Sequence, residues 1–238
     1  EEITIKDSIN SLLNLDYPEY EIVVINDGST DGTADKLIDS FNLKKIARPI
    51  RKSVICKAEE SIYENSQGIK IVLISKENGG KADALNMGIN ASRYPLYVCM
   101  DADSMLKKDA LKKIIEPFLT NDETIAVGGN IKVSNHLLIK NGEVVKTSSP
   151  KKLLVIFQII EYLRVFLTSR VSFNGINANL IISGAFGIYS KKAAINVGGY
   201  TPGVIGEDME IIVKMHAFYR KNRLRYKMGY VADAICWT

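Results

Sequence analysis

The sequence predicts an α/β fold in which a doubly wound, mostly parallel sheet carries helices on both faces. Three observations predict this fold. Short β-branched or apolar strands alternate with helical repeats through the first half of the chain. Polar, glycine-bearing turns follow these strands directly. The 238 residues fit one large α/β domain or two small ones, and 46% of them are apolar, which is enough for a substantial core.

The first half of the chain supplies the alternating elements. Apolar residues at helical spacing predict a helix over residues 3–15, and a β-branched strand follows over 21–25. Ligands bind beyond the carboxyl ends of strands in such sheets, so we expect Asp27 and Asp101, which both follow strands, to lie at one edge. The later elements are a helix over 34–41, an irregular insertion over 44–68, a strand over 69–74, a helix over 82–91, a strand over 96–100 and a helix over 106–119.

The second half changes character. A strand is predicted over 124–133, and a turn-rich stretch over 138–150 surrounds Asn141-Gly142. Residues 153–166 form the most apolar stretch of the chain and are predicted to be helical. A narrow polar stripe runs along this helix and consists of Gln158, Glu161, Arg164 and Thr168.

This apolar helix has two interpretations. It is either an interfacial helix over 151–170 that lies on a membrane or a helix buried in the core. The first interpretation places Lys151, Lys152, Arg164 and Arg170 near lipid headgroups. No apolar run reaches the roughly 18 residues that a membrane-spanning helix needs.

Composition excludes some classes of function. The net charge of +4 is mild and no dense basic tract is present, so nucleic-acid binding has no support. Cys56, Cys99 and Cys236 are odd in number and far apart, which favours a reducing compartment and argues against a zinc site. The abrupt ends at Glu1 and Thr238 indicate a fragment of a longer protein, truncated at both ends.

The acidic triplet Asp101-Ala102-Asp103 is the first chemical signal. It follows the apolar run 97–100, and residues two apart on a strand point to the same side. Two carboxylates presented together suit one hard divalent cation that shares its ligands with substrate phosphates. Acidic pairs also cap helices, so the triplet by itself leaves both interpretations open.

Two polar turns are candidate nucleotide contacts. Asp27 can accept hydrogen bonds from a base or ribose and Gly28 permits close backbone approach, although a plain Asx turn has the same residues. The run Asn78-Gly79-Gly80-Lys81-Ala82-Asp83 opens a helix, where free N–H groups and the lysine suit a diphosphate. The alternative there is a flexible turn with a solvated lysine.

Two further motifs lie in the second half. Glu207 and Asp208 follow Gly206 at the start of a helix, where they either complement the helix dipole or supply a general base. The helix N-terminus lowers the pKa of a carboxylate, so burial or a nearby diphosphate must act against it. The run 183–187 places small residues beside an aromatic, as either a wall for a flat ring or a tightly packed strand requires.

The motifs NDGSTDGT, ENGGKADALN, MDADS, SGAFG and GED follow one another over nearly the whole chain. In this order they resemble the family 2 inverting glycosyltransferases of GT-A fold. The resemblance is greatest to the membrane-bound bacterial branch that includes poly-N-acetylglucosamine, hyaluronan, chitin and cellulose synthases. It implies transfer of a sugar from a UDP-sugar donor to a hydroxyl of a growing glycan acceptor, with inversion and with Mg²⁺ or Mn²⁺ as cofactor.

The resemblance also implies an organisation. Residues 1–123 would form a nucleotide-binding half and 124–238 an acceptor-binding half. The catalytic domain would lie on the cytoplasmic side of a bacterial cell membrane and reach its surface through flanking segments. The family's first strand should precede Glu1 and its Gln-x-x-Arg-Trp motif should follow Thr238, and neither is in this sequence.

The roles that the resemblance implies fall on five groups of residues. Asp208 matches the catalytic base and Glu207 is its neighbour. Asp27, with Gly28 beside it, matches the aspartate that contacts uracil. The remaining matches are Lys81 and Asp83 near the diphosphate, Asp101 beside the nucleotide and metal, Asp103 as the principal metal ligand, and Ser183, Gly184 and Ala185 at the acceptor end.

Two alternative functions remain open on the sequence. The first is a sugar-nucleotide-binding subunit of a synthase without turnover, against which the intact Asp101, Asp103 and Asp208 argue. The second is a nucleotidyltransferase, which needs a glycine-rich, basic loop after its first strand that this sequence lacks. The sequences Gly-x-Ser-x-Gly and Gly-x-Gly-x-x-Gly are absent, which counts against an α/β-hydrolase and a Rossmann oxidoreductase.

Overall fold

The computed structural model describes residues 4–238, which pack as two units. Unit 1 contains Pro18–Tyr97 and Ser190–Asn222, together with the first described residues up to Lys6. Unit 2 contains Asp7–Tyr17, Val98–Tyr189 and Arg223–Thr238. The packing therefore interleaves the chain, whereas the predicted halves 1–123 and 124–238 follow chain order.

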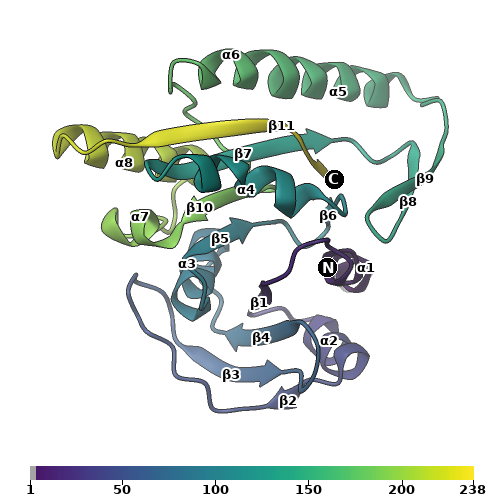
Figure 1. The fold of residues 1–238 in the computed structure, drawn as a ribbon. Coiled ribbons are helices and arrows are strands. Elements are labelled where there is room, and N and C mark those ends of the chain that lie inside the picture. The colour runs from purple at the N-terminus through teal and green to yellow at the C-terminus, as the bar shows by residue number, and fades with distance from the viewer. Residues whose placement is uncertain (1–3) are drawn as a thin grey trace. The chain divides into compact units, whose positions relative to one another are not determined.

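Unit 1 is built on a four-stranded sheet with the order β1-β4-β3-β2 (Figure 1). β1 and β4 are parallel and in register to their last residues, where Asp27 pairs with Lys76. β3 is antiparallel to β4 and β2 to β3, so the expectation of an irregular insertion over 44–68 is wrong at these two strands, whereas residues 46–58 between them are irregular. The strands are β1 (Glu21–Asp27), β2 (Lys44–Lys45), β3 (Glu59–Glu64) and β4 (Lys70–Lys76).

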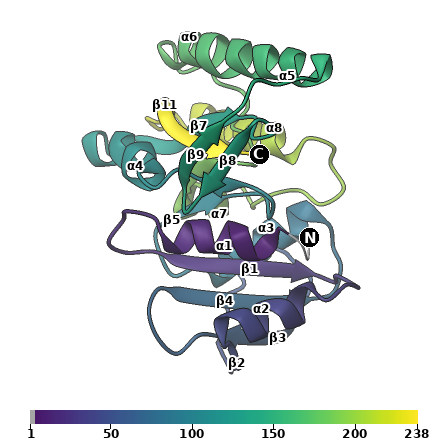
Figure 2. The same cartoon turned by 90° about the vertical axis from the view of Figure 1, so that its right-hand side faces the viewer.

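Helices cover both faces of this sheet. α3 packs on β1 and α2 on β4, and the two helices lie on opposite faces (Figures 1 and 2). β4 is consequently buried over Ile71–Ile74. Asn86 of α3 donates to the Tyr200 carbonyl and accepts from its N–H, each at 2.8 Å, which joins the later segment to this unit. The helices are α2 (Thr33–Phe41), α3 (Lys81–Ala91), α7 (Lys191–Asn196) and α8 (Glu207–Lys221).

Unit 2 contains most of a five-stranded sheet with the order β5-β10-β7-β11-β6. β7 and β11 are parallel, whereas β10 is antiparallel to β7 and β6 is antiparallel to β11. α4 (Ala110–Thr120) packs on β7 and β11. The strands are β5 (Leu96–Cys99), β6 (Met105–Leu106), β7 (Thr124–Lys132), β10 (Gly187–Ser190) and β11 (Lys227–Trp237).

The expectation that Asp27 and Asp101 follow strands of one sheet edge is wrong. β1 belongs to the first sheet and β5 to the second. Among the described residues each of these strands has one hydrogen-bonded neighbour, β4 for β1 and β10 for β5, so each ends its own sheet. The α/β class itself is confirmed, and both sheets are mixed, since each contains a parallel pair beside antiparallel ones.

Short elements account for the remaining differences in unit 2. The helix expected from residue 106 begins at Ala110, because Met105 and Leu106 pair with β11 as β6. The turn-rich stretch is a hairpin of β8 (Leu137–Lys140) and β9 (Glu143–Thr147). Asn141 and Gly142 join the strands with φ values of 52° and 73°, as a two-residue turn of type I′ requires.

The helices predicted over 3–15 and 153–166 are confirmed, but their bounds differ. α1 (Ile5–Leu13) replaces the helix expected over 3–15, of which residue 3 lies outside the described residues. The long apolar helix consists of α5 (Leu153–Leu163), the π-helix η1 (Arg164–Ser169) and α6 (Arg170–Asn174). Within residues 4–238, no helix is both long and apolar enough to cross a membrane.

Burial decides between the two interpretations of this helix. α5 contains no buried residue, and Phe166 is the one buried residue of η1. The four members of the polar stripe are exposed, and Leu153, Phe157 and Ile160 are more than half exposed as well. The interpretation of a helix buried in the core is therefore wrong for this structure.

Candidate functional site

Asp27 lies at the centre of the nucleotide-side residues of unit 1. It is the last residue of β1, whereas the sequence predicted it in the turn after the strand. Its Oδ1 accepts from the Gly79 N–H at 3.0 Å and its Oδ2 from the Gly80 N–H at 2.7 Å. The Asn78 side chain donates to the Asp27 carbonyl at 2.7 Å. The structure therefore brings the first two predicted nucleotide motifs into direct contact.

A buried lysine that the sequence interpretation missed joins these motifs. Lys76, the last residue of β4, is 0% exposed, and its Nζ lies 2.5 Å from Asp27 Oδ1 and 2.6 Å from Asp83 Oδ1. Burial by itself lowers the pKa of Lys76, but hydrogen bonds to the two carboxylates and their charges outweigh burial and raise it. Lys76 thus stays charged between two of the predicted nucleotide-side residues.

Close packing in this loop explains two of its glycines. A Cβ at Gly79 would lie 2.6 Å from the Asp83 carboxyl carbon, so only glycine fits over that carboxylate. Gly28 has φ +71°, and a Cβ there would lie 2.9 Å from the Asn78 Cβ. Asp83 also accepts from the Lys57 N–H at 3.0 Å and is buried, so its place in the structure is that of an anchor for the loop.

The third motif of unit 1 lies beside the same loop. Lys81, at the first residue of α3, is 3.3 Å from the Glu207 carboxylate. Glu207 and Asp208 form the first turn of α8, whose preceding Gly206 has φ 86°. The predicted diphosphate lysine and the predicted base motif are therefore neighbours, although 126 residues separate Lys81 from Glu207 in the chain.

The acidic triplet lies in unit 2 and has a different local geometry from the one expected. β5 ends at Cys99, and the Ser104 N–H donates to the Asp101 carbonyl at 3.1 Å, which closes a turn over 101–104. The argument from strand alternation is therefore wrong, because the carboxylates belong to a turn. Asp103 is exposed and Asp101 is half-buried.

The donor chemistry of this turn fits a hard divalent cation. Carboxylate oxygens are the ligands that Mg²⁺ and Mn²⁺ accept, and Mg²⁺ usually takes one or two of them with substrate phosphates completing the shell. Residues 4–238 contain no group of three or more acidic, histidine or cysteine side chains that could form a complete cage. Burial raises the pKa of the nearby Cys236 thiol to about 12, with the charges of Asp101 and Asp103 acting in the same direction, so the free thiol stays protonated at neutral pH.

The predicted acceptor residues lie in a packed turn of unit 2. The Phe186 N–H donates to the Ser183 carbonyl at 3.1 Å, and Gly184 and Ala185 are buried between them. Phe186 is 0% exposed and lies where a Cβ at Gly129 would meet its ring at 2.2 Å. The aromatic ring therefore packs in the core, and only Ser183 of the three predicted residues is partly exposed.

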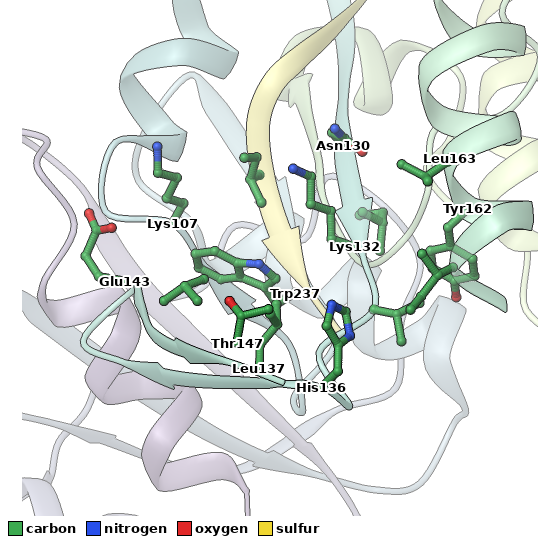
Figure 3. Close-up of a pocket in the computed structure, with 15 residues that line it drawn as sticks. Lys107, Asn130, Lys132, His136, Leu137, Glu143, Thr147, Tyr162, Leu163 and Trp237 are labelled. Carbon is green, nitrogen blue, oxygen red and sulfur yellow. The ribbon is translucent and has the colours of Figure 1, made fainter. Parts of the chain in front are cut away.

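A cavity of about 480 Å³ lies elsewhere in unit 2 (Figure 3). It lies among β7, β11, the hairpin and α5, and Trp237, His136 and Tyr162 are among the side chains on its walls. Its lining is mostly apolar and includes none of the predicted site residues. The cavity therefore does not mark the predicted chemistry.

Comparison with known proteins identifies the family. Residues 1–194 match the family described as "Glycosyl transferase family 2". The chain belongs to this family. The chain is also 32% identical over 234 residues to the poly-β-1,6-N-acetyl-D-glucosamine synthase of Staphylococcus epidermidis strain RP62A, which covers 98% of the chain and 46% of that protein. The synthase of the same name from Staphylococcus aureus strain COL is 32% identical over 235 residues, with the same coverage.

This glycosyl transferase family 2 chain therefore spans about half the length of the curated relatives it matches. Solved structures share its fold across 100% of the chain. The mannosyltransferase PcManGT of Pyrobaculum calidifontis, in complex with GDP-Man and Mn²⁺, is 18% identical with a TM-score of 0.65 over 53% of that chain. S. aureus TarS 1–349, in complex with UDP-GlcNAc, is 18% identical with a TM-score of 0.58 over 55% of that chain. These likenesses confirm the predicted GT-A fold.

Proposed function

We propose that the chain is the catalytic domain of an inverting glycosyltransferase that builds a β-linked polysaccharide from a UDP-sugar. The observation that carries this proposal is the convergence of three distant motifs in unit 1. The Gly79 and Gly80 N–H groups bind Asp27, and Lys81 contacts Glu207. Family membership and the names of the relatives support the same reaction. The proposed location is a bacterial cell membrane, with the domain on its cytoplasmic side.

Each proposed role uses the chemistry of one side chain. Asp208 takes the proton from an acceptor hydroxyl as its oxygen attacks the anomeric carbon, and Glu207 is its neighbour in the first turn of α8. A single displacement inverts the anomeric centre, so an α-linked donor gives a β-glycoside. Asp27, Gly28, Lys81 and Asp83 form the nucleotide side, and Ser183, Gly184 and Ala185 remain the proposed acceptor end.

Mg²⁺ or Mn²⁺ is the proposed cofactor. Asp103 would hold the ion, with Asp101 beside the nucleotide, and oxygens of the donor diphosphate would complete its ligands. The bound ion supplies positive charge that stabilises the diphosphate leaving group.

Calorimetry of UDP binding tests this function. We expect UDP to bind in the presence of Mn²⁺, and Asp103→Asn to weaken that binding by about 10- to 100-fold, since even indirect partners of a metal ligand have effects of this size. Asp122→Asn removes an equal charge from an exposed turn of the same unit and should leave binding unchanged. Equal affinity with Mn²⁺ and with a chelator would contradict the metal role, and tighter binding of a nucleoside triphosphate would favour the nucleotidyltransferase.

The membrane surface is the second proposed partner. Exposed apolar side chains recur at steps of three and four residues along α5 and η1, at Leu153, Phe157, Ile160, Leu163 and Leu167. This face is flanked by the exposed Lys151 and Lys152, and the one acidic residue of these helices, on the polar stripe, pairs with Arg164. An apolar face with basic flanks fits an interface with anionic lipid headgroups.

Vesicle flotation tests the membrane contact. We expect the protein to float with phosphatidylglycerol-containing vesicles, and Phe157→Glu combined with Leu167→Glu to abolish flotation because both charges would enter the acyl region. Gln158→Glu combined with Thr168→Glu adds the same charge on the exposed polar stripe of the same helix. A larger fraction of this double variant than of the first should float with the vesicles. Equal flotation of the two double variants would remove this proposal.

A further inference from the structure

Most of the hydrogen-bond acceptor positions of the Asp27 carboxylate are already occupied. An ionised carboxylate offers about four lone-pair positions. Within residues 4–238, three donors reach it, namely the Lys76 ammonium, the Gly79 N–H and the Gly80 N–H. Two of these bonds end on Oδ1 and one on Oδ2, and the side chain keeps 19% of its exposure. One acceptor position on Oδ2 therefore remains for a ligand.

Lys76 decides what kind of ligand can use that position. Its three ammonium protons are directed to Asp27, to Asp83 and to the Glu77 carbonyl at 2.6 Å. Carboxylate oxygens accept hydrogen bonds, and the fully buried Lys76 ammonium holds Oδ1 of this carboxylate in place, which fixes the direction of Oδ2. A pyrimidine or purine with a ring N–H can donate a hydrogen bond to this oxygen. A ring nitrogen that carries a lone pair is repelled by it.

We propose that Lys76 is a positioning residue that fixes the orientation of the Asp27 carboxylate and thereby selects nucleotides whose base presents a ring N–H, such as uracil, over cytosine. This inference rests on the proposed function and adds a residue to its nucleotide side. Lys76 acts through Asp27, because its own side chain is closed to a ligand. The two residues are cross-strand partners at the ends of β1 and β4, so the strand register itself fixes their geometry.

Paired nucleotides test the selectivity. UDP and CDP carry the same diphosphate and differ at the base, where uracil N3 bears a hydrogen and cytosine N3 does not. We expect the wild-type protein with Mn²⁺ to prefer UDP by about tenfold to a hundredfold, the usual range for one hydrogen bond to a charged group. In Lys76→Met this preference should fall to within about threefold, mostly through weaker UDP binding.

Lys57 provides the matched control. Its Nζ contacts Glu77 Oε1 at 2.7 Å and the Asn78 carbonyl at 2.6 Å, so it is a second lysine beside the same loop, although it belongs to the segment before β3. Its side chain does not contact the Asp27 carboxylate within the described residues. Lys57→Met should therefore keep the wild-type UDP preference, although it removes the same charge.

A second variant guards against loss of folding. Lys76→Met combined with Asp83→Asn removes the buried cation together with one buried anion, and Asp27 still loses its cation. We expect the double variant to fold and to lack the UDP preference. An equal weakening of UDP and CDP, or an unchanged preference, in the folded variants would overturn the role of Lys76 and leave the proposed function standing. Wild-type protein that binds neither nucleotide would overturn the proposed function, and this inference with it.

Discussion

Asp208→Asn is expected to lower the rate of sugar transfer by about 10²- to 10⁴-fold, which is the usual contribution of a positioned general base. The asparagine keeps the size of the side chain but cannot accept the proton of the acceptor hydroxyl at neutral pH. UDP affinity should change by less than about twofold, because the base acts on the acceptor and the loss appears in the transition state. Release of UDP measures the rate of transfer, and calorimetry measures the affinity.

Glu210→Gln is the matched control for this change. Glu210 lies in the same first turn of α8 and loses the same charge, but its carboxylate bonds the Thr201 hydroxyl at 2.7 Å and pairs with Lys214. We expect its transfer rate to stay within about threefold of the wild-type rate, as is usual for a group outside the proton transfer. A turnover of Asp208→Asn similar to that of Glu210→Gln would contradict the assignment of the base.

Arg48→Met is expected to lower the free energy of unfolding by about 3–5 kcal/mol, because it leaves buried carboxylates without their cation. Arg48 donates from Nη2 to Glu21 at 3.1 Å and to the Ala91 carbonyl at 2.8 Å, and from Nη1 to Glu64 at 3.3 Å. The side chains of Arg48 and Glu21 are 4% and 5% exposed. Thermal unfolding should show a melting temperature lower by roughly 10 °C for a chain of this size.

Two comparisons separate this effect from the loss of any positive charge. Lys112→Met breaks the pair with Asp16 at 2.7 Å, in which both side chains are more than half exposed, and should cost less than about 1 kcal/mol. Arg48→Met combined with Glu21→Gln should regain part of the loss, since one buried charge is removed with its partner. Equal melting temperatures for the Arg48 and Lys112 variants would contradict the buried network.

The same network predicts a pH dependence. Burial by itself raises the pKa of Glu64, but the hydrogen bond and charge of Lys70 and the charge of Arg48 outweigh burial and lower it below the ordinary 4.5. A carboxylate with a lowered pKa in the folded state stabilises the fold above the unfolded-state value and loses that contribution as the pH falls through its folded value. The contribution of Glu64 is therefore complete at neutral pH and disappears only in acid.

Local patterns in the sequence were sufficient for most elements of unit 1 but not for their pairing. The β-branched run ending at Asp27 and the helix after Gly80 are visible in the sequence because their apolar spacing is regular. β3 was missed because Glu59, Glu60 and Glu64 interrupt the apolar pattern that predicts a strand. Its strand conformation depends on pairing with β4, which lies outside the local sequence. Assigning β1 and β5 to separate sheets required strand order, which no local pattern encodes.

In the candidate site, too, residues in local motifs could be predicted, whereas a residue placed by strand pairing could not. Asp27, Lys81 and Glu207 stand in recognisable motifs, so residue type and spacing located them. Lys76 stands in the unremarkable run Ile-Ser-Lys-Glu, and a lysine before a turn usually points to solvent. The signal that could have found it is the pairing of two strand ends, one acidic and one basic, which becomes readable only once β1 and β4 are known to be neighbours.

The burial of Lys76 also has a consequence for chemical labelling. Amine-directed reagents react with the uncharged, accessible form of a lysine, and Lys76 is closed to solvent with its pKa raised. Lys57, before β3, and Lys81, at the start of α3, lie beside the loop and are 43% and 47% exposed, so they are open to such reagents. Acylation of the surface lysines would therefore strip positive charge from the outside of the loop while the cation beneath Asp27 keeps its charge and its bonds.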